Sequence, residues 1–213
     1  MKIDKEKQEF NFLEKLLAGR GIKFVIEIGC GDGRITKMLD EILGADITAI
    51  DADEVALEKA KKKLPKVYFK KSGFTDFFSD DKFDLMVFSM SAHHLPNFEF
   101  QYVKIVRFLK EEGYVLFIEP NIKNQISKLV LIEDPEEELR VENTAKIIKN
   151  LPWKKVVDQT LKLIWQFENL AQLNKKLFED HDHVDEIKKI LKCETDKKVE
   201  LTDEINYSLF KIS

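Results

Sequence analysis

The fold of this chain is decided by the stretch FVIEIGCGDG, residues 24–33. Its first five residues form a short apolar run that predicts a buried strand, and three glycines follow within the next five. Residues 35–43 then show apolar side chains at helical spacing, and Gly44 stands where a helix C-cap is expected. A strand that passes through a glycine-rich turn into a helix is typical of doubly wound α/β folds, in which a ligand approaches the turn.

Short apolar runs continue to alternate with amphipathic ones on both sides of this stretch. An N-terminal helix is expected over residues 4–18. Further helices are expected over 53–64, begun by Asp53 and ended by Pro65, and over 98–110, with Gly113 as a C-cap. The remaining expected strands are 47–50, 67–69, 85–89 and 114–119. The alternation predicts an α/β fold with a Rossmann-like, doubly wound, mostly parallel sheet.

The composition changes after Pro120. Residues 121–195 read as entirely helical and predict a lid, with apolar side chains such as Trp165 that form its core or line an acceptor pocket. The tail returns to strand pattern at 198–202 and 205–212, which predicts an antiparallel C-terminal hairpin turning at Asp203-Glu204. We therefore expect a single domain over 1–213, with its core in 20–120 and 196–213 and a helical lid insertion over 121–195.

Composition places the chain among globular proteins and excludes several classes. The 213 residues are 44% hydrophobic and 35% charged, with a net charge of -4, which argues against a globally basic nucleic-acid coat. The two cysteines, Cys30 and Cys193, are too far apart in sequence to indicate a disulfide framework or a paired metal motif. The charged N-terminus and the absence of a long apolar stretch predict a cytoplasmic protein without a membrane segment.

Acidic side chains at two strand ends narrow the class of ligand. Glu27 lies inside the end of the first predicted strand, where it repels an anionic group and attracts a cationic one. The dinucleotide fingerprint requires a glycine at the sixth position counted from Gly29, where this chain has the bulky Arg34. Asp51 ends the second predicted strand, where a carboxylate accepts hydrogen bonds from both ribose hydroxyls. The pattern favours a cationic adenosine compound such as S-adenosylmethionine over a pyrophosphate cofactor.

Four ordered segments carry a family resemblance. Residues 27–33, 47–63, 83–89 and 109–120 resemble, in order and spacing, the class I S-adenosylmethionine-dependent methyltransferases. The resemblance covers about residues 20–120. It implies a seven-stranded sheet with a reversed last strand and a cofactor, S-adenosylmethionine, lying over the carboxyl ends of the strands.

The resemblance also implies roles for single residues. Glu27, Gly29 and Gly31 would contact the methionine part of the cofactor, and Asp51 would hold the ribose. Many relatives have an aspartate for the adenine amino group where this chain has Ser72, so the adenine contact falls to the Ser72 hydroxyl or to its neighbours. The positions carried over as cofactor-binding are Glu27, Gly29, Cys30, Gly31, Asp51, Ala52, Ser72, Gly73, Phe74, Ser89 and Met90.

The run Ser91-Ala92-His93-His94-Leu95 resembles the small-molecule branch of the family that includes ubiquinone-biosynthesis enzymes. His93 and His94 are expected to face the substrate, where an imidazole accepts a proton from a phenol or another hydroxyl acceptor. The alternative is that one imidazole packs and caps the following helix. Glu119, at the tip of the fifth expected strand, is expected to orient substrate or to pair with a neighbour.

The sequence lacks the residues that several other functions would require. No Asp/Asn-Pro-Pro-Tyr/Phe motif follows the fourth expected strand, which argues against amino-group methylation of adenine or glutamine, and no Pro-Cys nucleophile is present. Lysines 59–71 read as a solvated helix end rather than an RNA-binding patch, and the acidic run 133–138 as a solvated helix start. No metal site is expected, because the spacing of His181 and His183 would direct their rings apart.

The sequence thus predicts a methyltransferase that transfers a methyl group from S-adenosylmethionine to a small-molecule acceptor by direct in-line displacement. One alternative is a methyltransferase-fold protein that has lost turnover and acts as a binding or scaffold partner. Another is a methyltransferase acting on RNA or protein. No catalytic residue, acceptor or oligomeric state is predicted.

Overall fold

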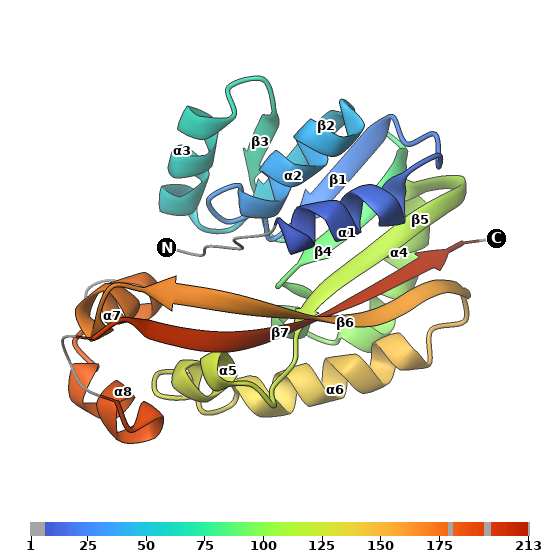
Figure 1. Ribbon diagram of the computed structural model, residues 1–213. Helices are drawn as coiled ribbons and strands as arrows, with labels where there is room; N and C mark the ends of the chain where they lie inside the picture. The colour runs from blue at the N-terminus through green and yellow to red at the C-terminus, as the bar shows by residue number, and fades with distance from the viewer. Residues whose placement is uncertain (1–6, 179–180, 194–196, 213) are drawn as a thin grey trace.

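A computed structural model describes residues 7–178, 181–193 and 197–212. A seven-stranded sheet lies at the centre, with helices on both faces and strands in the order β3-β2-β1-β4-β5-β7-β6 (Figure 1). The pairs β1–β2, β2–β3, β1–β4 and β4–β5 are parallel, whereas β7 runs antiparallel to β5 and β6. The predicted Rossmann-like α/β class and the reversed last strand are therefore confirmed.

The elements follow the predicted alternation through the first half of the chain. The strands are β1 (Phe24–Ile28), β2 (Asp46–Asp51), β3 (Tyr68–Lys71), β4 (Phe83–Ser89), β5 (Leu109–Pro120), β6 (Lys154–Phe167) and β7 (Val199–Lys211). The helices are α1 (Gln8–Leu17), α2 (Arg34–Leu43), α3 (Glu54–Lys63), α4 (Tyr102–Phe108), α5 (Gln125–Val130), α6 (Glu137–Lys149), α7 (Leu170–Phe178) and α8 (Val184–Leu191), with short 3-10 helices η1 (Ala92–His94) and η2 (Phe98–Phe100). The expected helix over 4–18 is α1 in its described part, and residues 1–6 lie outside the described residues.

Two apolar cores cover the two faces of the sheet. Val25 of β1 belongs to the cluster under α1, α2 and α3, whereas its neighbour Ile26 belongs to the cluster that includes α4 and α6. Alternate side chains of a strand point to opposite faces, so a strand that is apolar at every position is buried on both. Glu27 follows Ile26 on the same face as Val25, fully buried in the first cluster's layer.

Local helix signals are confirmed where the sequence states them directly. Asp53 caps α3, because its carboxylate accepts hydrogen bonds from the backbone N–H groups of Val55 and Ala56. Gly44 ends α2 in the left-handed conformation with φ 55°.

The predicted role of Gly113 is wrong. Helix α4 ends at Phe108, and Gly113 lies inside β5, where the β4 register shifts between Phe83 and Leu85. A Cβ on Gly113 would lie 2.9 Å from the carbonyl oxygen of Lys110. The glycine therefore permits a close approach within an irregular strand rather than ending a helix.

The expectation that residues 121–195 are entirely helical is also wrong. This segment contains β6, which is an edge strand paired with the full length of β7. Of its fourteen residues only Leu163 and Phe167 are buried, so the strand lacks the regular alternation by which a half-buried strand is recognised. Its lysines suit an exposed sheet edge.

The C-terminal hairpin was predicted with its turn in the wrong place. β7 is one continuous strand through Asp203, and its antiparallel partner at the edge is β6. Asp203 is buried, and its carboxylate accepts a hydrogen bond from Trp165 Nε1 at 2.9 Å. That partner allows an acidic residue to occupy the middle of a strand.

The far half of the β6–β7 pair extends beyond the other strands toward α7 and α8 (Figure 1). A third apolar cluster joins α5, α7, α8 and the ends of both strands, and includes Leu129, Phe167, Leu173, Ile187 and Leu201. The expected lid is therefore a mixed unit of helices built on two extended strands.

Candidate cofactor and acceptor site

A cleft of about 910 Å³ opens beside the glycine-rich turn, at the carboxyl ends of β1 and β4. Five of the residues predicted to bind the cofactor line this cleft: Gly29, Cys30, Gly31, Ser89 and Met90. The cleft lies where strand order reverses, with β2 and β4 on opposite sides of β1. Ligands of open α/β sheets bind at this kind of crevice.

The first two glycines of the turn, Gly29 and Gly31, lack a side chain for different structural reasons. A Cβ on Gly29 would lie 2.3 Å from Cβ of Ser91, so the absence of a side chain there lets the β4–η1 turn pack against the loop. A Cβ on Gly31 would meet nothing within 4 Å, and Gly31 lines the cleft with φ +52°. Gly31 is thus the position at which bare backbone is open to a ligand.

Glu27 presents an unpaired carboxylate oxygen within the part of the chain that the structure describes. Its Oε2 accepts a hydrogen bond from Thr36 Oγ1 at 2.6 Å, whereas its buried Oε1 has no partner among those residues. Burial raises the pKa of Glu27 to about 7. A buried carboxylate with a free acceptor oxygen is suited to a cationic ligand group.

Arg34, the residue that replaces the third glycine, takes part in a buried network below the turn. Its Nη1 lies 2.5 Å from Oε2 of Glu9, and Oε1 of Glu9 accepts a hydrogen bond from the hydroxyl of Tyr207 at 2.5 Å. Desolvation opposes the charge of Arg34, but Glu9 outweighs it and raises the guanidinium pKa. The network ties α1 and β7 to the start of α2, next to the cleft.

Asp51 lies at the tip of β2 with its carboxylate turned toward the glycine-rich loop. Oδ2 accepts a hydrogen bond from the Gly31 N–H at 2.7 Å, and Oδ1 accepts one from the Asp53 N–H at 2.9 Å. The carboxylate is only partly buried. It is therefore within reach of a ligand that lies over Gly31.

The predicted adenine-side residues are placed less favourably. Ala52, Ser72 and Gly73 lie outside the lining of the 910 Å³ cleft, and the Ser72 hydroxyl donates to the carbonyl oxygen of Gly73 at 2.9 Å. Phe74 is 1% exposed and packs edge-on against Phe88 in the core. A contact between adenine and the Phe74 ring is therefore disfavoured, and adenine contacts from Ser72 and Gly73 stay predictions.

A smaller cavity of about 220 Å³ adjoins the cleft. Met90 and Trp165 line both spaces, so these two side chains form a wall that the two spaces share. Met90 has φ +51°, a conformation that a residue with a side chain adopts at a cost, and its N–H donates to the Ile118 carbonyl at 2.8 Å. The smaller cavity is lined by Met90, His93, His94, Pro120, Ile122, Ile126, Ser127, Val130, Glu137, Val141, Trp165 and Asp203.

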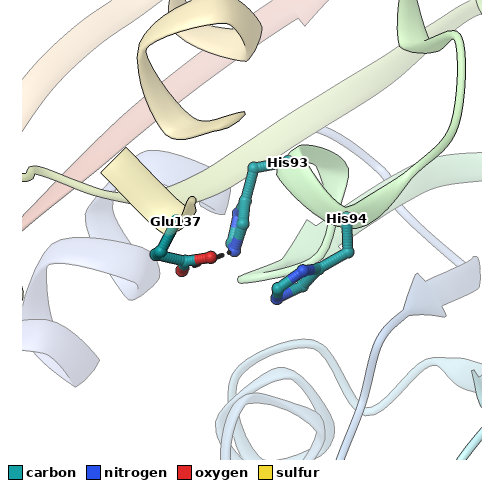
Figure 2. A group of neighbouring side chains, drawn as sticks. All are labelled: His93, His94 and Glu137. Atoms are coloured by element: carbon teal, nitrogen blue, oxygen red, sulfur yellow. Dashed lines mark ion pairs between the residues drawn. The ribbon is translucent and has the colours of Figure 1, made fainter. Parts of the chain in front are cut away.

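His93 lies between two carboxylates, of which Figure 2 shows that of Glu137. Its Nδ1 is 2.5 Å from Oε2 of Glu119, and its Nε2 is 3.0 Å from Oε1 of Glu137. Burial alone would lower the pKa of His93, but the two carboxylates outweigh it and raise the pKa to about 9. His93 is therefore an imidazolium that donates from both nitrogens, which removes it as a base.

Glu119 holds the η1 turn as well. Its Oε1 accepts hydrogen bonds from the backbone N–H groups of Ser91 and Ala92, at 3.2 and 2.9 Å. Of the two roles predicted for Glu119, pairing with a neighbour is the one that the structure displays. Desolvation opposes the charge of Glu137, but His93 and Arg140 lower its pKa to about 2.

His94 differs from His93 although the two rings are 4.0 Å apart (Figure 2). Desolvation and the neighbouring positive charge of His93 lower its pKa. His94 is exposed and lines the smaller cavity, so it offers a neutral imidazole there. Sequence patterns cannot separate two adjacent histidines, because the difference arises from Glu119 and Glu137, which lie on elements far from the histidines in sequence.

The lysine-rich segment is consistent with its solvated interpretation. Lys61 pairs with Glu58, Lys63 with Asp32 and Lys71 with Glu54. Three of its positive charges are thus already matched by acidic side chains, which weakens the RNA-binding alternative.

The expectation that the rings of His181 and His183 diverge is wrong. Nδ1 of His181 and Nε2 of His183 lie 2.5 and 3.0 Å from the same oxygen, Oε1 of Glu133. The acidic run that reads as a solvated helix start thus supplies Glu133 here and Glu137 beside His93. Both pairings depend on tertiary packing, which gives no local signal in the sequence.

Part of the chain is similar to proteins of known family. A family model described as a methyltransferase domain matches residues 26–117. The malonyl-[acyl-carrier protein] O-methyltransferase of Bacillus cytotoxicus is 31% identical over 108 residues, which cover 49% of this chain and 38% of that protein. The matched segment is therefore similar to the class I S-adenosylmethionine-dependent methyltransferases.

Other similar proteins agree with this assignment. The trans-aconitate 2-methyltransferase of Rhizobium rhizogenes is 28% identical over 129 residues, covering 60% of this chain and 45% of that protein. The YcgJ protein from Bacillus subtilis shares the fold, with a TM-score of 0.67 at 15% identity over 95% of this chain and 97% of that chain. The chain therefore spans less than half the length of these two curated relatives but nearly all of a solved structure with its fold.

S-adenosylmethionine, the cofactor of these proteins, fits the residues of the cleft together with Glu27 and Asp51, which lie next to the glycine-rich turn but outside the lining of the cleft. The unpaired Oε1 of Glu27 is suited to the ammonium group, and the open face of Gly31 leaves room for the methionine chain. Asp51 would accept hydrogen bonds from the ribose. The N-methyltransferase NodS from Bradyrhizobium japonicum, solved with S-adenosyl-l-homocysteine, shares the fold with a TM-score of 0.59 at 14% identity over 98% of this chain and 87% of that chain.

Burial raises the pKa of the Cys30 thiol, which leaves it protonated and unsuited to nucleophilic attack. Among the described residues, every helix is too short or too polar to cross a bilayer.

Proposed function

We propose that this methyltransferase transfers the methyl group of S-adenosylmethionine to a hydroxyl oxygen of a small, largely apolar acceptor. The observation that carries the proposal is that Met90 and Trp165 line both the cofactor cleft and the smaller cavity. A donor in the cleft and an acceptor in the cavity would thus meet at these two side chains. Positioning of this kind supplies much of the catalysis in direct displacement.

The lining of the smaller cavity supports an apolar, uncharged acceptor. Its volume of about 220 Å³ suits a small molecule or the end of a longer one. Ile126, Val130 and Trp165 supply apolar surface, whereas Glu137 is ionised and would repel an anionic acceptor.

The proton of the acceptor hydroxyl would pass to His94. The cofactor supplies an activated methyl group and its own leaving group. The chain holds the acceptor in line, and the neutral imidazole of His94 accepts the proton as the oxygen is methylated. His93 is a positioning residue, because its two carboxylate partners join η1 to the tip of β5 and to α6.

A methyl-transfer assay tests the proposal. The full chain is incubated with S-adenosylmethionine carrying a labelled methyl group and a panel of phenols and other small hydroxyl compounds, and the products are identified by mass spectrometry. We expect an O-methylated product from at least one apolar member, and none from the Gly31→Arg variant, whose side chain would fill the cleft.

The result also separates the alternatives. Tight binding of S-adenosylhomocysteine with no transfer to any hydroxyl acceptor would contradict the proposal and favour a binding or scaffold role. Transfer to RNA or protein, but to none of the small molecules, would favour the macromolecular alternative.

A further inference from the structure

Three side chains with metal-ligating atoms converge at the far end of the lid. They are Glu133, in the link between α5 and α6, and His181 and His183, in the link between α7 and α8. One ligand atom from each lies within 4.8 Å of the others. The donor set of two imidazoles and one carboxylate comes from two segments almost fifty residues apart.

The backbone that carries the two histidines is held by a buried amide. Nδ2 of Asn174 donates to the carbonyl oxygen of His181 at 2.8 Å, and Oδ1 of Asn174 accepts from the N–H of His183 at 2.7 Å. Asn174 is 8% exposed. Its two hydrogen bonds fix the spacing of the two histidines from within the fold, which favours preorganised ligands.

The ring of His183 is held from two further sides. It packs edge-on against Phe178 at a centroid distance of 4.9 Å. Its Nδ1 lies 4.0 Å from Oε2 of Glu186, whereas its Nε2 lies 3.0 Å from Oε1 of Glu133. Metal-binding histidines commonly have a carboxylate near the nitrogen that does not bind the metal.

A second group, His93, His94 and Glu137, also places its ligand atoms within 4.8 Å. There, however, the guanidinium of Arg140 lies 2.7 Å from the Glu137 carboxylate, and this positive charge would repel an added cation. Glu133 has the two imidazoles as its ionic partners in the described part of the chain. Imidazoles bind metals in their neutral form, so the Glu133 group is the better cation site.

We propose that Glu133, His181 and His183 bind one divalent transition-metal ion, with zinc as the probe. Imidazole nitrogens and carboxylate oxygens are ordinary ligands of Zn²⁺ at about 2.0–2.2 Å, and a tetrahedral arrangement separates such ligands by roughly 3.4 Å. Small side-chain rotations would bring the three atoms to that separation. Water would complete the coordination, since His181 is 72% exposed.

The ion would join two parts of the lid. Glu133 follows α5, whose Ile126, Ser127 and Val130 line the smaller cavity, and the two histidines precede α8. Metal binding would hold α5 against the α7–α8 unit and stabilise this wall of the cavity. The inference does not depend on methyl transfer, because none of the three ligands lines the cofactor cleft.

Calorimetric titration of the full chain with ZnCl₂, after treatment with a chelator, tests the site. The expected result is one site per chain, with affinity weakened at least about tenfold in His181→Ala and in Glu133→Gln. Both side chains are exposed, so these substitutions should leave the fold intact. Zinc should raise the Tm of the wild type but not that of either variant.

His94→Ala is the matched control, because it removes an exposed imidazole from the other group. It should bind zinc like the wild type. Loss of zinc binding in His94→Ala alone would place the ion at the second group and overturn the proposal, as would equal binding by all four proteins or no stoichiometric binding. The visible absorption of bound Co²⁺, altered in His181→Ala, would confirm imidazole ligation.

Discussion

Nδ1 of His93 lies 2.5 Å from Oε2 of Glu119, and this contact joins the η1 turn to the tip of β5. Because Glu137 approaches the other ring nitrogen, the contact extends to the first turn of α6. A charged imidazole therefore holds together three elements around the smaller cavity. The pair also explains why the adjacent His94 stays neutral: the nearby positive charge lowers its pKa.

The stability of the protein should depend on the charge of His93. Its pKa in the fold is about 9, above the ordinary 6.5, so its stabilising contribution is complete below about pH 6.5 and is lost as the pH rises through about 9. The groups facing it are Glu119, Glu137, Arg140 and His94. We expect His93→Gln to cost about 3 kcal/mol at pH 7, since it leaves the buried carboxylate of Glu119 without its cation and Glu137 with Arg140 alone.

Denaturant unfolding of the wild type and of His93→Gln, at pH 7 and at pH 10, measures the stabilising contribution of the His93 charge. The difference in unfolding free energy between wild type and His93→Gln should shrink at the higher pH, where the wild-type imidazole is also uncharged. A difference of the same size at both pH values would show that His93 acts through packing alone.

Glu27 should make cofactor affinity pH-dependent. Its pKa of about 7 is raised by burial, so in the free protein the carboxylate is half protonated near neutrality and attracts a cation less as the pH falls. We expect the affinity for S-adenosylmethionine, measured by calorimetry, to decrease from about pH 8 to pH 6. Glu27→Gln should bind about tenfold more weakly, with little dependence on pH in that range.

The same substitution should affect the stability of the free protein in the opposite direction. A carboxyl group whose pKa is raised in the fold favours the folded state at low pH, and this contribution is lost as the pH rises from about 4.5 through 7. Glu27→Gln should therefore be at least as stable as wild type at pH 8. A markedly less stable variant would indicate that the Thr36 hydrogen bond, rather than desolvation, dominates at this position.

Gly31 and Gly44 provide a matched pair for testing the open face of the loop. Both have positive φ, at +52° and +55°, and a Cβ at either meets nothing within 4 Å. An alanine should thus cost a similar amount of stability at each, about 1 kcal/mol. Only Gly31→Ala should weaken binding of S-adenosylhomocysteine, because only Gly31 lines the cleft. Equal affinities of the two variants would argue that the ligand does not approach Gly31.

Sequence analysis predicted the elements whose signals are local. The buried strand around Glu27, the Asp53 cap and the glycine-rich turn each depend on neighbouring residues, and the structure places them as predicted. The edge strand β6 was missed because its burial is irregular. The turn assigned to Asp203-Glu204 was wrong because the acidic residue is satisfied by Trp165 from another strand.

The same difference between local signals and long-range contacts applies to the residues of the candidate site. Gly31 and Met90 were found because they lie in or directly after family motifs, and both line the cleft. The roles of the charged side chains could not be predicted from the sequence. The protonation of His93 depends on its contact with Glu137. The convergence of His181 and His183 depends on Glu133. These contacts arise when helices far apart in sequence pack together.

His94 should act as the base of the proposed reaction. It is the exposed, neutral imidazole of the smaller cavity, and general-base catalysis contributes about 10²–10⁴-fold to rates. We expect His94→Gln to lower kcat at least about a hundredfold while leaving the affinity for S-adenosylhomocysteine unchanged, because His94 does not line the cofactor cleft. Since desolvation and the charge of His93 lower the pKa of His94, wild-type kcat should decline only at a pH below the range in which an ordinary histidine titrates. His181→Gln, compared with the wild type in metal-free buffer, is the control, because it removes an exposed imidazole that lines neither cavity, and it should retain the wild-type profile. A His94→Gln enzyme with unaltered kcat would exclude this imidazole as the base and leave acceptor ionisation to solvent.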